Sequence, residues 1–288
     1  MKRNILNSPR LLELKKHRRK VFWGKIALAI FALLAIFSGL AFLSRVPSVN
    51  IHVVEIIGNK VLDGEVLKAV VEKEIAGNYL WFFPKTNILI YPKNKIAREL
   101  QDEFPRIKNI DFSINDKQSL EVSLTERVAL YTWCGVTPPD INGTNEPQCS
   151  FLDDSGYIFD EAPYFSGEVY FKFYGSLNSG GDSPLKTYFY PVNFTKFTLF
   201  KKILESMGLV PVSLYADDAG DAHIFLARKT MLTGPEIMFK TDADLETVAE
   251  NLQAALSTEP LLSNFKNKYS SLLYIDLRFG NKVYYKFK

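Results

Sequence analysis

An uncharged apolar segment near the amino terminus limits what this chain can form more than any other part of its sequence. Ile26 to Leu43 contains 18 residues, none of them charged, and one serine is its single polar side chain. As a helix it extends about 27 Å, and the two aromatic residues before it bring the length close to the roughly 30 Å of a bilayer's hydrocarbon core. We therefore predict one membrane-spanning helix over residues 22–44. A soluble core helix is seldom apolar on every face, and Phe42 to Arg45 offers no signal-peptide cleavage site.

The charges on the two sides of this segment predict its orientation. The first 25 residues hold nine of the 35 basic residues and one of the 32 acidic ones, which leaves 26 basic against 31 acidic residues beyond them. Positive flanks stay in the cytoplasm, so residues 1–21 are expected to form a basic cytoplasmic tail and the remainder to be exported.

This charge distribution also argues against nucleic-acid binding. The exported part carries a net charge of about −5, whereas a nucleic-acid module needs a basic face. The basic cluster at Leu14 to Lys20 adjoins the apolar helix, where anionic lipid head groups explain it.

Hydrophobic periodicity predicts an α+β fold. A β-branched strand, Ile51 to Ile57, precedes a helix that Asp63 can cap, and a second helix stops before Pro105. Two alternating strands, at 110–114 and 120–124, complete the order strand, helix, helix, strand, strand. We predict that residues 49–127 form one domain with a three-stranded sheet and two helices on one face.

The remainder, residues 128–288, is expected to be a mostly antiparallel β domain with flanking helices. Asp242 can cap one of these helices. Two strands about a Gly280-Asn281 turn, Leu272 to Phe279 and Lys282 to Phe287, predict a β-hairpin at the end of the sequence.

Cys134 and Cys149 are the two cysteines of the chain, and both fall in the exported part, where oxidation is permitted. They flank an insertion, Thr137 to Gln148. A disulfide would close a loop of about fifteen residues and contribute roughly 3 kcal/mol in the chain-entropy model. Two buried free thiols remain the alternative.

The sequence carries no motif that predicts catalysis, a metal or a cofactor. It contains no G-x-S-x-G elbow, phosphate-binding loop, H-E-x-x-H helix or Cys/His cluster. The acidic pairs Asp153-Asp154 and Asp217-Asp218 lie in turn signals, where solvated Asp is ordinary. We predict a protein that is not an enzyme, with no catalytic, metal or cofactor residues.

Several segments, taken in order, resemble one family. V-x-x-I followed by Gly58 and Asn59 comes after the apolar helix, then F-P-R-I-K-N-I (104–110) and S-L-E-V-S-L-T-E-R (119–127). Further on come D-x-x-G-x-x-F (153–159) and Y-I-D-L-R-F (274–279). This series resembles the FtsQ/DivIB bacterial cell-division proteins. The resemblance implies a POTRA domain over 49–127 and an FtsQ-type β domain over 128–288.

The resemblance also implies a function. Such a chain would be a single-pass, type II scaffold of the divisome in the cytoplasmic membrane at the division septum, with its carboxyl-terminal domains outside. It would link early and late division proteins during septal wall synthesis, and its partners would be membrane-anchored FtsB/DivIC-like and FtsL-like proteins. The alternatives are a membrane-anchored cell-envelope enzyme and a POTRA-type chaperone or secretion component.

In the family, the carboxyl-terminal region receives a β-strand from the FtsB-type partner. Carried over by position, Arg278 would pair with a partner carboxylate, and neighbouring residues would supply the docking strand and its contacts. The partner-binding candidates are Arg278, Phe279, Lys282, Val283, Tyr284 and Tyr285. Those candidates whose side chains lie on the inward face of the strand are expected to fill the domain core instead.

Overall fold

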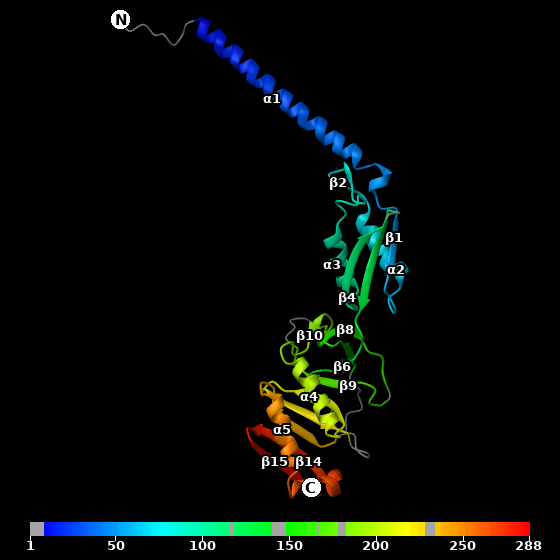
Figure 1. The fold of residues 1–288 in the computed structure, drawn as a ribbon, viewed down its shortest axis with the longest axis vertical. Helices are drawn as coiled ribbons and strands as arrows, with labels where there is room; N and C mark the ends of the chain where they lie inside the picture. Colours follow the sequence, from blue (N-terminus) through cyan, green and yellow to red (C-terminus); the bar gives the residue numbers. More distant parts are fainter. Residues whose placement is uncertain (1–8, 116–117, 140–147, 166, 178–182, 228–233) are drawn as a thin grey trace, which may run out of the picture. The chain divides into compact units, whose positions relative to one another are not determined.

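The chain forms a mixed helix and strand structure, seen in Figure 1. A computed structural model describes residues 9–115, 118–139, 148–165, 167–177, 183–227 and 234–288. The structure begins with a long apolar helix and contains a large, mostly antiparallel sheet, which confirms the predicted α+β class. It divides into two compact units. Unit 1 comprises Met1–Glu103 and Asn109–Thr125, and unit 2 comprises Phe104–Lys108 and Glu126–Lys288.

The apolar segment lies in α1 (Pro9–Leu43), a helix of 35 residues. Its portion Glu13–Leu43 is long and apolar enough to cross a membrane, and the rest of the chain buries almost none of it. A core helix of a soluble protein would be covered on its apolar faces. This helix is therefore consistent with a single-pass membrane protein.

The helix begins earlier than the sequence predicts. We expected it to start at residue 22, after a separate tail, whereas α1 already starts at Pro9. Proline suits the first helical position, where its missing N–H would have had no partner. The Leu, Lys, Arg and Glu residues that follow are good helix formers, so the apolar helix extends toward the amino terminus.

Unit 1 continues with a three-stranded sheet and two helices. The parallel pair β1 (Val53–Ile57) and β5 (Ser119–Glu126) places β5 in the centre of the sheet, with β4 (Ile107–Ile114) on its other side. The helices α2 (Gly64–Ile75) and α3 (Lys93–Glu103) bury apolar side chains at helical spacing. These three strands and two helices follow one another in the predicted order.

Unit 1 contains one local feature that the sequence predicted and one that it did not. The predicted cap is confirmed, because the Asp63 carboxylate accepts a hydrogen bond from the backbone N–H of Glu65 at 2.9 Å. A short hairpin between the helices, β2 (Asn78–Tyr79) with β3 (Phe83–Pro84), was not predicted. A short 3-10 turn, Pro47–Val49, follows α1.

Unit 2 is built on a ten-stranded sheet. In spatial order its strands are β10 (Thr187–Tyr188), β8 (Tyr157–Glu161), β7 (Ser150–Leu152), β6 (Tyr131–Trp133), β9 (Phe171–Gly175), β11 (Pro211–Ala216), β12 (Asp221–Leu226), β13 (Glu236–Lys240), β14 (Leu272–Phe279) and β15 (Lys282–Phe287). The pairs β6–β9, β9–β11 and β13–β14 are parallel, and the others are antiparallel.

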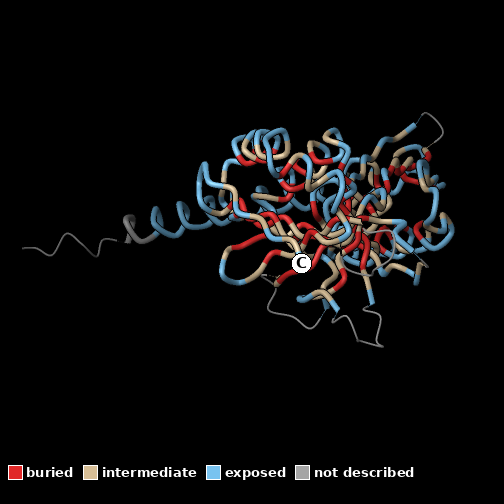
Figure 2. Tube along the Cα trace, turned by 90° about the horizontal axis from the view of Figure 1, so that it is seen from below, coloured by how far each residue is buried: buried red, intermediate tan, exposed pale blue. Residues whose placement is uncertain are grey.

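Three helices and an aromatic core complete unit 2. They are α4 (Phe194–Ser206), α5 (Leu245–Leu256) and α6 (Leu261–Lys268), and a 3-10 turn, Tyr269–Ser271, leads into β14. Seven phenylalanines among the described residues of this unit are almost completely buried: Phe159, Phe173, Phe189, Phe194, Phe197, Phe200 and Phe239. Figure 2 marks such buried segments in red. Burial of these aromatic side chains stabilises the unit.

One predicted helix cap in unit 2 is wrong. We expected Asp242 to cap α5, but Asp244 does so. Its carboxylate accepts hydrogen bonds from the backbone N–H of Glu246 at 3.3 Å and from the Thr247 hydroxyl at 2.7 Å. Both aspartates precede the same apolar stripe, and the tertiary position of the helix decides between them.

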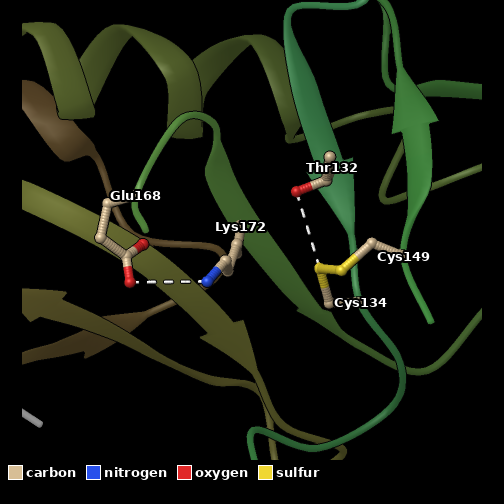
Figure 3. The surroundings of a disulfide bond; sticks show 5 residues. All are labelled: Thr132, Cys134, Cys149, Glu168 and Lys172. Atoms are coloured by element: carbon tan, nitrogen blue, oxygen red, sulfur yellow. Dashed lines mark hydrogen bonds and ion pairs between the residues drawn. A yellow bond between two sulfur atoms is a disulfide. The ribbon is translucent and has the colours of Figure 1, made fainter. Parts of the chain in front are cut away.

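The two cysteines are joined in the structure, with their Cα atoms 4.1 Å apart (Figure 3). Cys134 follows β6 and Cys149 precedes β7, and these strands are antiparallel neighbours. The Cys134 sulfur is buried beside the Thr132 hydroxyl. Most of the predicted insertion between them, residues 140–147, lies outside the described residues.

Replacing Cys134 and Cys149 together by serine is expected to lower the free energy of unfolding of unit 2 by about 3 kcal/mol. The reason is that the unfolded chain regains the freedom of a fifteen-residue loop. Urea denaturation without reductant measures the change. A reducing agent should destabilise the wild-type protein similarly and leave the double variant unaffected; free thiols in unreduced, alkylated protein would contradict the prediction.

Candidate interaction edge at the last strand

The candidate site is the β14–β15 hairpin at one end of the unit 2 sheet. Its turn contains Gly280, whose backbone has a φ of +64°, a conformation that glycine adopts without strain. The Asn251 amide of α5 donates to the Gly280 carbonyl oxygen at 3.2 Å and holds the turn. Within the described residues, β15 pairs with β14 alone, so the sheet ends there.

The backbone groups of β15 alternate between β14 and the free side. Lys288 donates its backbone N–H to the Ser271 carbonyl oxygen at 2.8 Å, which fixes the direction at one end of the strand. The two register shifts in this pairing place the extra residues on β14, so β15 itself stays regular. The N–H and C=O groups of Val283, Tyr285 and Phe287 consequently point away from β14. They form an open edge that can accept another strand.

The side chains of β15 also alternate. Val283, Tyr285 and Phe287 are half-buried and pack against the apolar core. The predicted contact residues Val283 and Tyr285 therefore direct their side chains inward, as expected for one face of the strand. Lys282 and Tyr284 are exposed on the other face.

An exposed aromatic pair lies beside this edge. Phe279 and Tyr284 are 56% and 50% exposed, and their ring centroids are 5.4 Å apart in an edge-to-face arrangement. Aromatic side chains supply much of the binding energy of protein interfaces. Of the predicted contact residues, these two present apolar surface to solvent.

Arg278 already has two carboxylate partners within unit 2. Its guanidinium donates to Asp276 at 2.9 and 2.6 Å and to Asp221 of β12 at 2.6 Å. Lys240 of β13 contacts the same Asp221 at 2.5 Å. A partner carboxylate would have to compete with these internal pairs, so the predicted pairing of Arg278 with a partner remains a prediction.

The contacts among Arg278, Asp221 and Asp276 favour the charged form of these three groups. Burial, the largest influence on the two aspartates, acts to raise their pKa values. Hydrogen bonds from Lys240 and Arg278 to Asp221, and from Arg278 to Asp276, outweigh it, and both pKa values lie below the ordinary value. The hydrogen bonds of Arg278 to Asp276 and Asp221 raise the pKa of its guanidinium. The cluster thereby ties β12, β13 and β14 together next to the hairpin.

The partners of Arg278 were not predicted from the sequence. Asp276 lies two residues before it, a spacing that could have suggested the contact, whereas Asp221 lies 57 residues away. No local signal connects those positions. Only the order of strands in the sheet brings them together.

His223 of β12 lies among acidic side chains. Its Nδ1 is 3.0 Å from a Glu236 oxygen, its Nε2 is 3.8 Å from an Asp217 oxygen, and its ring lies beside Tyr215. The hydrogen bond to Glu236 is the main cause of a raised His223 pKa. Burial and the charge of Arg278 oppose the rise.

We expect this histidine to make unit 2 more stable in acid than in base. Because the folded-state pKa exceeds the ordinary value of 6.5, the contribution is complete below about pH 6.5 and disappears as pH rises through the folded-state pKa. His223→Gln should lower the melting temperature more at pH 6 than at pH 8. Equal losses at both pH values in thermal unfolding would contradict the charged state of His223.

The acidic pairs that we weighed as catalytic candidates organise turns. The Asp153 carboxylate accepts hydrogen bonds from the backbone N–H groups of Ser155 at 2.8 Å and Tyr157 at 3.0 Å. Asp217 accepts in the same way from the N–H groups of Ala219 and Asp221. Among the residues that the structure describes, no group of three or more His, Cys, Asp or Glu side chains is placed to hold a metal.

We compared the chain with known proteins. No model of a known protein family matches its sequence. No curated protein matches it either. The function must therefore be argued from the chain's own residues and geometry.

Proposed function

We propose that this chain is a single-pass membrane scaffold of the bacterial divisome, of the FtsQ/DivIB type. It binds FtsB/DivIC-like and FtsL-like membrane-anchored partners outside the membrane and links early and late division proteins. Residues 49–127 serve as its POTRA domain. The observation that carries the proposal is the open β15 edge, which lies directly beside the strand containing Y-I-D-L-R-F.

Strand addition explains how such an edge binds a partner. An incoming strand pairs with the outward backbone groups of Val283, Tyr285 and Phe287, which supply affinity through hydrogen bonds. The exposed rings of Phe279 and Tyr284 add side-chain contacts on one face. Arg278 holds the hairpin in place through Asp221 and Asp276, so its role in this proposal is to position the edge.

In this proposal, the membrane helix keeps the binding surface on the outer side of the membrane that also anchors the partners. The nine-to-one excess of basic residues among the first 25 supports an amino terminus in the cytoplasm, with the domains over residues 49–127 and 128–288 outside it. A type II scaffold of this kind meets its partners only in the membrane in which they are anchored. The helix therefore raises the effective concentration of the partners, which allows a modest edge contact to suffice.

The location of the protein in dividing cells tests the proposal. A fluorescent protein fused after Lys288 is not suitable, because it would lie close to the edge strand β15. An amino-terminal fusion is expected to collect at the division site, and depletion of the chain should produce undivided cells. An even distribution over the envelope with normal division would contradict the proposal and favour an envelope enzyme or a secretion component.

A further inference from the structure

The hairpin between α2 and α3 exposes an unusual amount of apolar surface. In its loop, Leu80 is 78% exposed, Trp81 is 88% exposed and Phe82 is 48% exposed. Leu80 and Trp81 also have positive φ angles, 46° and 69°, which cost side-chain-bearing residues free energy. Three exposed apolar side chains in a row on a strained turn indicate a surface that binds something.

This loop contacts the carboxyl-terminal end of α1 within unit 1. The Phe37 ring lies 5.4 Å from the rings of both Phe82 and Phe83, measured between centroids. Arg45 donates to the backbone carbonyl oxygens of Phe82 and Trp81, each at 3.2 Å.

Two asparagines fasten the same end of the helix. Asn50 and Asn87 both donate to the Ser44 carbonyl oxygen, at 3.0 and 3.1 Å. Ser44 directly follows the last residue of α1, so these bonds satisfy an acceptor that a helix end would otherwise leave without a partner. Asn87 follows the hairpin in the chain, and its bond gives the hairpin segment a second attachment to α1.

The position of Phe37 sets the depth of the loop. Phe37 lies six residues before the end of the apolar helix, about 9 Å along its axis. When α1 spans a bilayer, that position lies within the hydrocarbon region or at its boundary. Side chains that contact Phe37 must lie at a similar depth. Tryptophan and other aromatic residues favour this boundary zone.

We propose that the loop Leu80–Phe82 inserts into the lipid interface at the carboxyl-terminal end of α1. The occupant of this apolar surface is lipid of the leaflet that α1 enters there. Leu80 and Trp81 lie among the head groups and upper acyl chains, and Arg45 holds the loop backbone against the helix. The part of unit 1 that follows α1 is thereby attached to the membrane both through α1 and through this loop. This inference goes beyond the proposed function and requires only that α1 spans the bilayer.

Spin labels on single introduced cysteines test the insertion. The full chain is reconstituted in vesicles of phosphatidylethanolamine and phosphatidylglycerol, with the native cysteines left in their disulfide. Leu80→Cys is compared with Leu33→Cys in α1, a reference for lipid, and with Val66→Cys on α2, an exposed reference for water. The collision rate of each label with oxygen reports exposure to lipid, because oxygen concentrates there. The collision rate with a water-soluble nickel complex reports exposure to water.

The label at Leu80 is expected to collide less with the nickel complex and more with oxygen than the label at Val66, while the label at Leu33, which lies deeper in the bilayer, should show the strongest form of both effects. A nickel collision rate at Leu80 equal to that at Val66 would overturn the proposal. Protection of Leu80 from both oxygen and nickel would also overturn it, because protein rather than lipid would then cover the loop. The Leu33 label shows in the same experiment that α1 is inserted.

Discussion

Replacing Val283 by proline is expected to weaken binding of the FtsB/DivIC-like partner about 10- to 100-fold while unit 2 stays folded. Proline removes the outward N–H of Val283 and places its ring on the open side, so an added strand loses at least one hydrogen bond and meets a steric obstacle. The ladder between β15 and β14 keeps its own bonds, because this N–H does not contribute to it. Titration of the full chain in nanodiscs with the purified partner measures the affinity.

Two matched variants separate the edge from the side chains. Tyr284→Pro removes an N–H that points toward β14, so it should destabilise the hairpin itself, which circular dichroism on heating would show. Tyr284→Ala keeps the backbone and removes one exposed ring, and a smaller loss of affinity is expected from it. Unchanged affinity in a folded Val283→Pro variant would place the docking surface elsewhere.

Asp153→Ala is expected to lower the free energy of unfolding of unit 2 by about 3–5 kcal/mol. Asp153 is 1% exposed and accepts hydrogen bonds from two backbone N–H groups and from the Arg127 guanidinium at 2.5 Å. Burial is the largest influence on this carboxyl and acts to raise its pKa, yet the hydrogen bonds from Ser155, Arg127 and Tyr157 lower the pKa overall. The substitution leaves a nearly buried arginine, stacked on the Tyr157 ring, without its carboxylate. Urea denaturation measures the loss.

The neighbouring aspartate provides the control. Asp154 pairs with Lys108 at 2.8 Å, but its side chain is 59% exposed and that of Lys108 is 37% exposed. Water screens such a pair, so Asp154→Ala should change stability by about 1 kcal/mol or less. Similar losses for the two alanine variants would show that burial does not distinguish these carboxylates and would contradict the assigned role of Asp153.

Local patterns predicted those parts of the fold that depend on neighbouring residues. The apolar run gave the membrane-length helix, and alternation about Gly280-Asn281 gave the final hairpin with its inward and outward side chains. The Asp63 cap was found because one acidic residue precedes that helix. The Asp242 prediction failed because Asp244 offers the same chemistry two residues later.

Features that depend on distant residues could not be predicted. The partners of Arg278 lie on two strands, β12 and β14, and the strand order that brings them together includes a parallel step from β13 to β14 that no turn signal specifies. The β2–β3 hairpin has strands of two residues, too short to show alternation. In the loop of this hairpin, Leu80 and Trp81 have left-handed backbone conformations, which leucine and tryptophan rarely adopt. Arg45, just after α1, donates a hydrogen bond to the Trp81 carbonyl oxygen in this loop.

Hydrogen exchange along β15 tests the central claim most directly. In the full chain alone, the amides of Val283, Tyr285 and Phe287 should exchange quickly, while those of Tyr284 and Lys286, which face β14, should be protected. Addition of the FtsB/DivIC-like partner is expected to protect the three outward amides and to leave the inward ones as they were. Partner binding that leaves these three amides exchanging at their original rates would contradict strand addition at this edge.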